Sequence, residues 1–424
     1  MQSKPRCGGT PYVCCQKALW ILLASCLVNL CLGSIYAWSV FASPMAEHLS
    51  TVTGLTLTSG DLAIVYTVAN SVGPITMISG GWFNDRFGPN KVILVGGLMF
   101  AAGMFLSGFA ASIGFLIVTY GLLTGLGLGM TYGCTISSCV KYFPDKRGLI
   151  GGITTAVYGM GSVILPPIVT ALVRMSDAAA AFRYIGIVFG VIITVCSFFI
   201  HKCPDGFAPE GWTPPASGGA HAADMDWRQM MRTPVFYIMI ILLTCGAFSG
   251  MMIISQASAV ATSMIGMTSA AAGAAVSVLA LFNTAGRIAA GYLSDKIGRI
   301  NTLTLTCVIS ILGLLCLFLC REGSYLFFYV GISVVGVCFG AFMGVFPGFT
   351  ADQFGPRHNS VNYGIMFIGF ALAGFFGPTA MRNIYSASGS YQQAFLAACA
   401  LSLAGVLLSF LYRWAARKGQ CAAK

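Results

Sequence analysis

Charged side chains are scarce in this sequence, in which only 8 % of 424 residues are Asp, Glu, Lys or Arg. Soluble globular domains carry about 25 % charged residues. Hydrophobic residues make up 57 % of the chain, which is too much for a soluble domain of ordinary composition. The composition therefore indicates a protein that is embedded in a lipid bilayer.

Acidic residues are the scarcest charges, and all 12 are expected in loops or at helix ends. Asp61, for example, is interpreted as an N-terminal residue of a membrane span. The 16 cysteines lie mostly within apolar stretches and form no paired framework in the outer loops. The sequence also lacks a metal-ligand cluster, a nucleotide-binding loop and a catalytic triad. We therefore expect no enzymatic activity, no cofactor and no bound metal.

Apolar runs of about 20 residues, the length with which an α-helix crosses ~30 Å of hydrocarbon, recur along nearly the whole chain. We count twelve, which predicts an all-α membrane protein with twelve transmembrane helices. The predicted spans are 18–41, 61–82, 92–111, 114–137, 149–173, 184–201, 234–256, 270–293, 302–319, 324–350, 361–384 and 393–412.

The formal net charge of +11 does not indicate a nucleic-acid partner, because the basic residues lie in the loops between spans. With the N-terminus inside, an even number of spans places most of the 23 lysines and arginines in cytoplasmic segments. This excess of basic residues is the usual determinant of membrane orientation. It predicts that both termini are cytoplasmic.

Two loops share the pattern G-x-x-x-D-[RK]-x-G followed by a basic residue. The first has Gly81, Asp85, Arg86 and Gly88 after the second span, and the second has Gly291, Asp295, Lys296, Gly298 and Arg299 after the eighth span. The glycines allow a close helix approach and a tight turn, while the Asp and the basic residue can bridge helix ends in one conformation and release them in another. We predict conformational gating for all nine residues.

The same position of these loops in each half predicts a duplicated six-helix unit. The predicted parts are a cytoplasmic N-terminus (1–17), an N-terminal six-helix bundle (18–201), a cytoplasmic linker (202–233), a C-terminal six-helix bundle (234–412) and a cytoplasmic C-terminus (413–424). Two registered motifs and twelve spans resemble the major facilitator superfamily. The resemblance implies two pseudo-symmetric bundles around a central cavity, which rock to open one side at a time.

Finer features resemble the oxalate/formate antiporter family, which is related to the monocarboxylate transporters. The resemblance is carried by 32–41 at the end of the first span, 142–148 after the fourth, 281–287 in the eighth and 362–364 at the start of the eleventh. It implies that Tyr36, Tyr132 and Tyr158 line a substrate cage, in which phenol hydroxyls donate hydrogen bonds to carboxylate oxygens.

Arg287 is the one formal charge well inside an apolar span. Arginine at mid-bilayer costs at least about 2.5 kcal/mol and does not deprotonate. No acid is available within the spans to neutralise Arg287, so we expect it to bind an anionic substrate, and its planar guanidinium suits a carboxylate held by two hydrogen bonds. A structural role, in which Arg287 caps carbonyl groups of a broken neighbouring helix, is the alternative.

Two departures from the family pattern narrow the substrate. Where the oxalate exchanger places a second cation, this chain has Phe370, and a divalent anion without its second counter-charge would lose several kcal/mol. Where proton-linked monocarboxylate transporters carry an acid, one helical turn before the arginine, this chain has Asn283. The resemblance therefore favours a small monocarboxylate such as lactate, pyruvate or formate over oxalate. Obligatory exchange and co-movement of a proton with the substrate both stay open.

The predicted function is secondary active transport of small organic anions by alternating access around Arg287. The alternatives are an oxalate/formate-type dicarboxylate antiporter and a carboxylate sensor of the same fold that does not transport. The expected partners are a small carboxylate and the lipid bilayer, without nucleic acid, and we expect a monomer. The resemblance implies a plasma membrane location, in the bacterial inner membrane.

Overall fold

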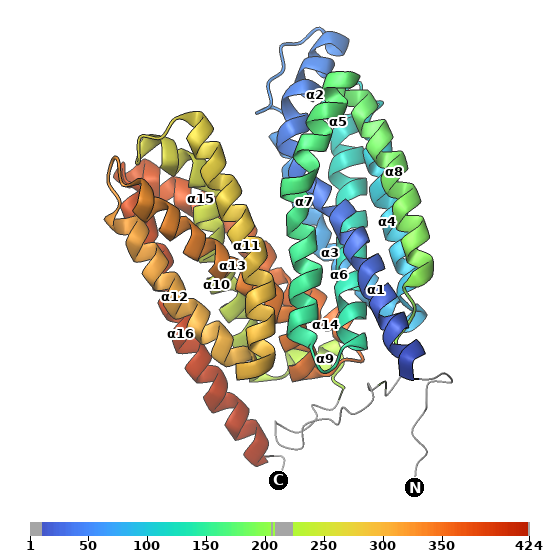
Figure 1. Cartoon of the computed structure of the whole chain (residues 1–424), viewed down its shortest axis with the longest axis vertical. Coiled ribbons are helices and arrows are strands. Elements are labelled where there is room, and N and C mark those ends of the chain that lie inside the picture. The colour runs from blue at the N-terminus through green and yellow to red at the C-terminus, as the bar shows by residue number, and fades with distance from the viewer. Residues whose placement is uncertain (1–10, 205–206, 208–223, 423–424) are drawn as a thin grey trace. The chain divides into compact units, whose positions relative to one another are not determined.

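The computed structural model describes residues 11–204, 207 and 224–422, and all regular structure in these ranges is helical (Figure 1). The predicted all-α fold is confirmed. Most of the predicted linker, part of the predicted N-terminal segment and the last two residues lie outside the described residues.

The chain divides into two compact units. Unit 1 comprises Met1–Pro144, Val157–Thr213 and Arg357–Gly364, and unit 2 comprises Asp145–Ala156, Pro214–Pro356 and Ile365–Lys424. Two short segments thus group with the opposite half of the sequence, Asp145–Ala156 with unit 2 and Arg357–Gly364 with unit 1. Helix α7 (Arg147–Met175) begins in unit 2 and continues in unit 1. The domain boundaries drawn on the sequence stay a prediction.

Unit 1 is a bundle in which α3 and α4 pack against α6, and α4 also packs against α8. Its elements are α1 (Pro11–Leu32), η1 (Gly33–Ala37), α2 (Trp38–Thr53), α3 (Ala63–Phe87), α4 (Pro89–Ser107), α5 (Ile113–Leu116), η2 (Ile117–Thr124), α6 (Gly125–Tyr142), most of α7, α8 (Ala178–Phe199) and most of α14 (Asn359–Met366).

Unit 2 is built around α13, which contacts α10, α11 and α12. Its elements are the start of α7, α9 (Trp227–Met231), α10 (Pro234–Ser263), α11 (Ser269–Ile297), α12 (Arg299–Leu319), α13 (Tyr325–Phe354), α15 (Ile368–Ser388) and α16 (Tyr391–Ala422). Several helices are longer than the predicted spans. The clearest is α16, whose last turns extend beyond its neighbours in unit 2 (Figure 1).

Eleven helices of the described residues are long and apolar enough to cross a membrane. The one predicted span that is not among these eleven, 61–82, corresponds to α3, whose 25 residues suffice for ~30 Å of hydrocarbon. Its hydropathy is reduced by polar residues such as Thr67, Asn70 and Ser71. Each of these three donates a hydrogen bond to the carbonyl four residues earlier, at 2.7–3.0 Å, so α3 satisfies these polar groups internally. The predicted twelve-helix architecture is confirmed.

The turn before α3 is organised by Asp61. Its carboxylate accepts hydrogen bonds from the backbone N–H and from the hydroxyl of Thr58, both at 2.8 Å. These bonds hold the pKa of the Asp61 carboxyl below its usual range. Asp61 therefore precedes α3, near the position that the sequence predicts.

Glycines set how closely α3 approaches α6. A Cβ at Gly129 would lie 1.9 Å from the carbonyl oxygen of Gly73, and a Cβ at Gly125 would lie 2.5 Å from that of Ala69. Any larger residue at these positions would force the two backbones apart. The four-residue glycine spacing in α6 thus serves helix packing in unit 1.

Candidate substrate site and gating clusters

Arg287 lies in α11 of unit 2, and its side chain is 5 % exposed. Glycines of the adjacent helices make room for its backbone. A Cβ at Gly152 in α7 would lie 2.3 Å from the Arg287 carbonyl oxygen, and a Cβ at Gly344 in α13 would lie 2.4 Å from the same atom. A side chain at either glycine would displace α11, so these glycines fix the position of Arg287 between α7 and α13.

The guanidinium of Arg287 is held by two neutral acceptors. Its Nη1 donates to the carbonyl oxygen of Thr155 at 2.6 Å, and its Nε donates to Oδ1 of Asn283, one turn earlier, at 3.2 Å. Within the described ranges, Arg287 makes no ion pair and its Nη2 has no hydrogen-bond partner. The positive charge therefore stays uncompensated, although Arg287 is not without partners.

The bond to Thr155 bears on the structural alternative for Arg287. It ties α11 to a backbone carbonyl of α7, as a purely structural arginine would. A neutral carbonyl does not cancel a full positive charge, however, and buried charges are normally paired. The geometry thus leaves one guanidinium edge and the whole charge available to an anion.

Phe370 in α15 belongs to an aromatic cluster of unit 2. Its ring centroid lies 4.5 Å from that of Phe367 and 6.2 Å from that of Phe339 in α13, and Phe339 is 4 % exposed. Gly250 in α10 accommodates Phe339, because a Cβ there would lie 2.5 Å from the ring. The position at which the resemblance would place a second cation is thus part of an apolar wall.

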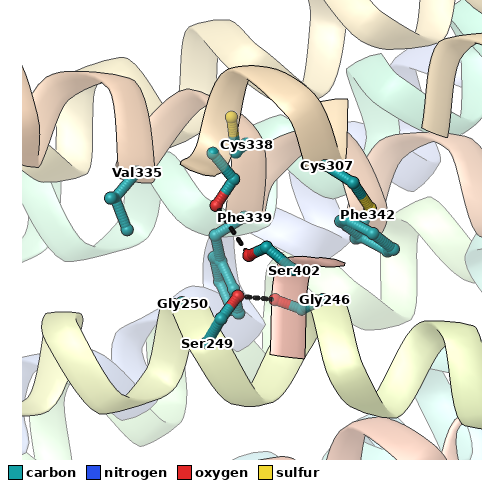
Figure 2. Close-up of a pocket in the computed structure, with 10 residues that line it drawn as sticks. Gly246, Ser249, Gly250, Cys307, Val335, Cys338, Phe339, Phe342 and Ser402 are labelled. Carbon is teal, nitrogen blue, oxygen red and sulfur yellow. Dashed lines mark hydrogen bonds between the residues drawn. The ribbon is translucent and has the colours of Figure 1, made fainter. Parts of the chain in front are cut away.

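A narrow gap lies beside Phe339 (Figure 2), and it has no room for a water molecule. Its polar groups are already paired. The hydroxyl of Ser249 donates to the Gly246 carbonyl at 3.0 Å, and the hydroxyls of Ser310 and Ser402 lie 3.2 Å apart. This gap is a packing feature behind the aromatic cluster rather than a ligand site.

The three tyrosines predicted from the resemblance lie together in unit 1. The Tyr158 ring in α7 is 5.3 Å from that of Tyr36 in η1 and 4.6 Å from that of Tyr132 in α6. Close backbone contact brings η1 against α7, since a Cβ at Gly33 would lie 2.3 Å from the Tyr158 carbonyl oxygen. The structure therefore assembles these side chains into one cluster, although their role in binding stays a prediction.

The second copy of the repeated motif forms a charged network in unit 2. The Asp295 carboxylate accepts hydrogen bonds from the backbone N–H groups of Gly148 and Leu149, at 2.9 and 2.8 Å. Nη1 of Arg299 donates to Asp295 at 2.6 Å, and Nε of Arg299 donates to Asp352 at 2.8 Å. Because α7 begins at Arg147, Asp295 lies at the positive end of the α7 helix dipole.

The first copy of the repeated motif forms the corresponding arrangement in unit 1. The Asp85 carboxylate accepts a hydrogen bond from Nζ of Lys141 at 2.7 Å and one from the backbone N–H of Val361 at 3.3 Å. Val361 lies in the first turn of α14. Each motif aspartate therefore caps the N-terminus of a helix that lies in the opposite half of the sequence.

The motif glycines lie at close backbone contacts and at turns. A Cβ at Gly81 would lie 2.6 Å from the Ser360 carbonyl oxygen, and a Cβ at Gly291 would lie 2.3 Å from that of Gly148, so both mark close backbone contacts. Gly88 and Gly298 have φ values of +91°, which L side chains rarely adopt. They form the turns that end α3 and α11.

Comparison with known proteins identifies the family. The sequence model of the Major Facilitator Superfamily matches residues 23–378 and 258–420. The chain belongs to the Major Facilitator Superfamily. Its fold is similar to that of the proton:xylose symporter XylE, with a TM-score of 0.70, 14 % identity and coverage of 94 % of this chain and 96 % of XylE.

Two relatives within the superfamily confirm the resemblance to the oxalate/formate antiporters and monocarboxylate transporters. The oxalate:formate antiporter of Oxalobacter formigenes is 28 % identical over 381 residues, which cover 88 % of this chain and 86 % of that protein. Monocarboxylate transporter 12-B of Danio rerio is 22 % identical over 418 residues, with 92 % and 86 % covered. These relatives are transporters and not enzymes.

The basic residue that follows each motif aspartate lies outside the networks of Asp85 and Asp295. Arg86 and Lys296 are exposed, and neither makes an ion pair with any described residue. Their charges instead lie over aromatic rings of their own helices. The contacts of each network are thus centred on the aspartate, the helix N-terminus and, in unit 2, on Arg299.

Two members of the charged networks, Arg147 and Lys141, were not predicted from the sequence. Arg147 donates to Asp352 at 2.7 Å and closes the network of unit 2, and Lys141 pairs with Asp85 in unit 1. The loops that contain Arg147 and Asp352 repeat loosely between the halves, which was the available signal.

Proposed function

We propose that this protein is a secondary transporter of small organic anions that binds the substrate carboxylate at Arg287. The observation that carries the proposal is the Arg287 guanidinium, which is 5 % exposed and has no carboxylate partner among the described residues. A buried cation of this kind is stabilised by an anion that enters with its own negative charge. The names of the relatives, which handle oxalate, formate and monocarboxylates, support the same class of substrate.

Within this class, we propose a small monocarboxylate. The aromatic cluster of Phe339, Phe367 and Phe370 is apolar and carries no second cation. It suits a hydrocarbon tail, whereas a dicarboxylate would bury its second charge without a counter-charge. A dicarboxylate remains the competing substrate because one relative is an oxalate:formate antiporter.

The two aspartate clusters support alternating access. Their bonds are charge-assisted and link helix ends, so each can be released and remade without disrupting a hydrophobic core. Asn283 occupies the position next to Arg287 where an acid would supply a proton relay, so we propose that the protein itself does not carry the coupling proton. We therefore propose that transport is an exchange of anions. We also propose that both chain termini lie in the cytoplasm.

The experiment uses the purified protein in liposomes that are loaded with one acid and offered labelled lactate, pyruvate, formate or oxalate. The proposal predicts saturable uptake of a monocarboxylate that requires a carboxylate on the opposite side. Preference for oxalate would favour the dicarboxylate antiporter. Specific binding without uptake of any acid would contradict transport and favour the sensor.

A further inference from the structure

Arg86 and Lys296 are basic residues of the repeated motif that make no ion pair with Asp85 or Asp295. The Arg86 Cζ lies 5.3 Å from the ring centroid of Trp82 and 5.6 Å from that of Phe87. The Lys296 Nζ lies 4.5 Å from the ring centroid of Tyr292. In each unit the cation thus lies over an aromatic ring four residues earlier, on the same helix face.

The rings beside these cations are large and exposed. Trp82, Phe83 and Phe87 are 45, 44 and 52 % exposed, and Tyr292 is 48 % exposed. All of them lie in the last turns of α3 or α11. Aromatic rings at the ends of membrane helices favour the level of lipid headgroups, where one side is apolar and the other is wet.

The charge around these rings is positive. Near the turn at Gly88, Lys91 and Lys202 are also exposed, and neither has an ion-pair partner among the described residues. The nearest motif carboxylate in unit 1, Asp85, is already bonded to Lys141. In unit 2 the carboxylate of Asp295 is likewise bonded to Arg299. Each surface therefore complements an anion.

We propose that Arg86 and Lys296 each bind the phosphate of an anionic phospholipid, one site in each repeat, in the leaflet at that end of the helices. The exposed rings contact the glycerol and the upper acyl chain of the same lipid. A free phosphate would leave these rings uncovered, and this is why the surface fits a lipid. The inference does not depend on the substrate of the transporter.

Lipid retention measured by native mass spectrometry from mixed micelles tests the proposal. The wild-type protein is offered phosphatidylglycerol or phosphatidylcholine at equal concentration, and we expect selective retention of up to two phosphatidylglycerol molecules. The Arg86→Gln/Lys296→Gln variant should bind phosphatidylglycerol about fivefold more weakly at each site. A variant that exchanges the two cations, Arg86→Lys/Lys296→Arg, should retain it.

Arg183→Gln is the matched control. Arg183 of α8 also lies over a ring, with its Cζ 5.2 Å from the ring centroid of Phe109. It is only partly exposed, and it lies beside Gly108 at the C-terminal end of α4, whereas Gly88 precedes the N-terminal end. We expect this variant to retain phosphatidylglycerol like the wild type. Unchanged retention in the double Gln variant, equal loss in Arg183→Gln, or displacement of the lipid by millimolar inorganic phosphate would each overturn the proposal.

Discussion

The carboxylate of Asp295 lies 2.9 Å from the backbone nitrogen of Gly148 and accepts its hydrogen bond at the N-terminus of α7. Asp85 has the corresponding relationship with Val361 in the first turn of α14. In both cases a carboxylate neutralises the unpaired N–H groups and the positive dipole of a helix end. The duplicated motif therefore has a duplicated structural role.

Asp295→Asn should impair transport without unfolding the protein. The amide keeps the shape of the side chain but loses the charge that binds two N–H groups and Arg299. Hydrogen bonds to charged groups contribute about 1.5–3 kcal/mol, so we expect exchange in liposomes to slow by about tenfold or more. Asp145→Asn is the control, since Asp145 makes only a 3.9 Å pair with Lys146, and equal loss in both variants would contradict the role of Asp295.

Gly291→Ala should separate α11 from the start of α7. The added Cβ would lie 2.3 Å from the Gly148 carbonyl oxygen, and overpacking of this kind costs about 1–3 kcal/mol. We expect slower exchange together with a lower melting temperature in detergent. Gly374→Ala in α15 is a matched change, because a Cβ there meets nothing within 4 Å. Normal transport by Gly291→Ala would show that this close contact is dispensable.

Much of this architecture could be predicted from sequence because membrane spans and repeated motifs have strong local signals. The apolar runs predict the helices, and the motif spacing predicts the aspartates at helix ends. By contrast, the bond from Arg287 to the Thr155 carbonyl joins residues 132 positions apart, and no side-chain pattern reports a backbone acceptor. The outward position of Arg86 and Lys296 also had no sequence signal, since a basic residue next to an aspartate fits either face of the helix end.

Asn283→Asp should make substrate affinity depend on pH. The new carboxylate would lie beside the Arg287 Nε, which now donates to Asn283 at 3.2 Å, and its pairing with Arg287 would lower its pKa. At neutral pH the ionised Asp would compete with the substrate, and on acidification its protonation would free Arg287. The ratio of variant to wild-type affinity should therefore be low at neutral pH and rise only below about pH 4, where an Asp with a lowered pKa takes up a proton. Wild-type affinity of the variant at neutral pH would contradict the contact.

Phe370→Lys should shift recognition toward dicarboxylates. The substitution places a cation within the aromatic cluster, where Phe370 now contacts Phe367 and Phe339. Competition of unlabelled oxalate against labelled monocarboxylate should become at least several-fold more effective. Phe370→Leu serves as the comparison, because it removes the ring without adding charge. If both variants respond to oxalate like the wild type, Phe370 does not face the substrate.

The most direct test of the central claim is carboxylate binding by Arg287 variants, measured by isothermal titration calorimetry on folded protein in detergent. Arg287→Ala should abolish binding, and Arg287→Lys should weaken it by about tenfold or more, because an ammonium cannot form the two parallel hydrogen bonds of a guanidinium. Both variants should retain the helical content of the wild type. Unchanged affinity in Arg287→Ala would contradict the account, since the substrate carboxylate would then be bound elsewhere.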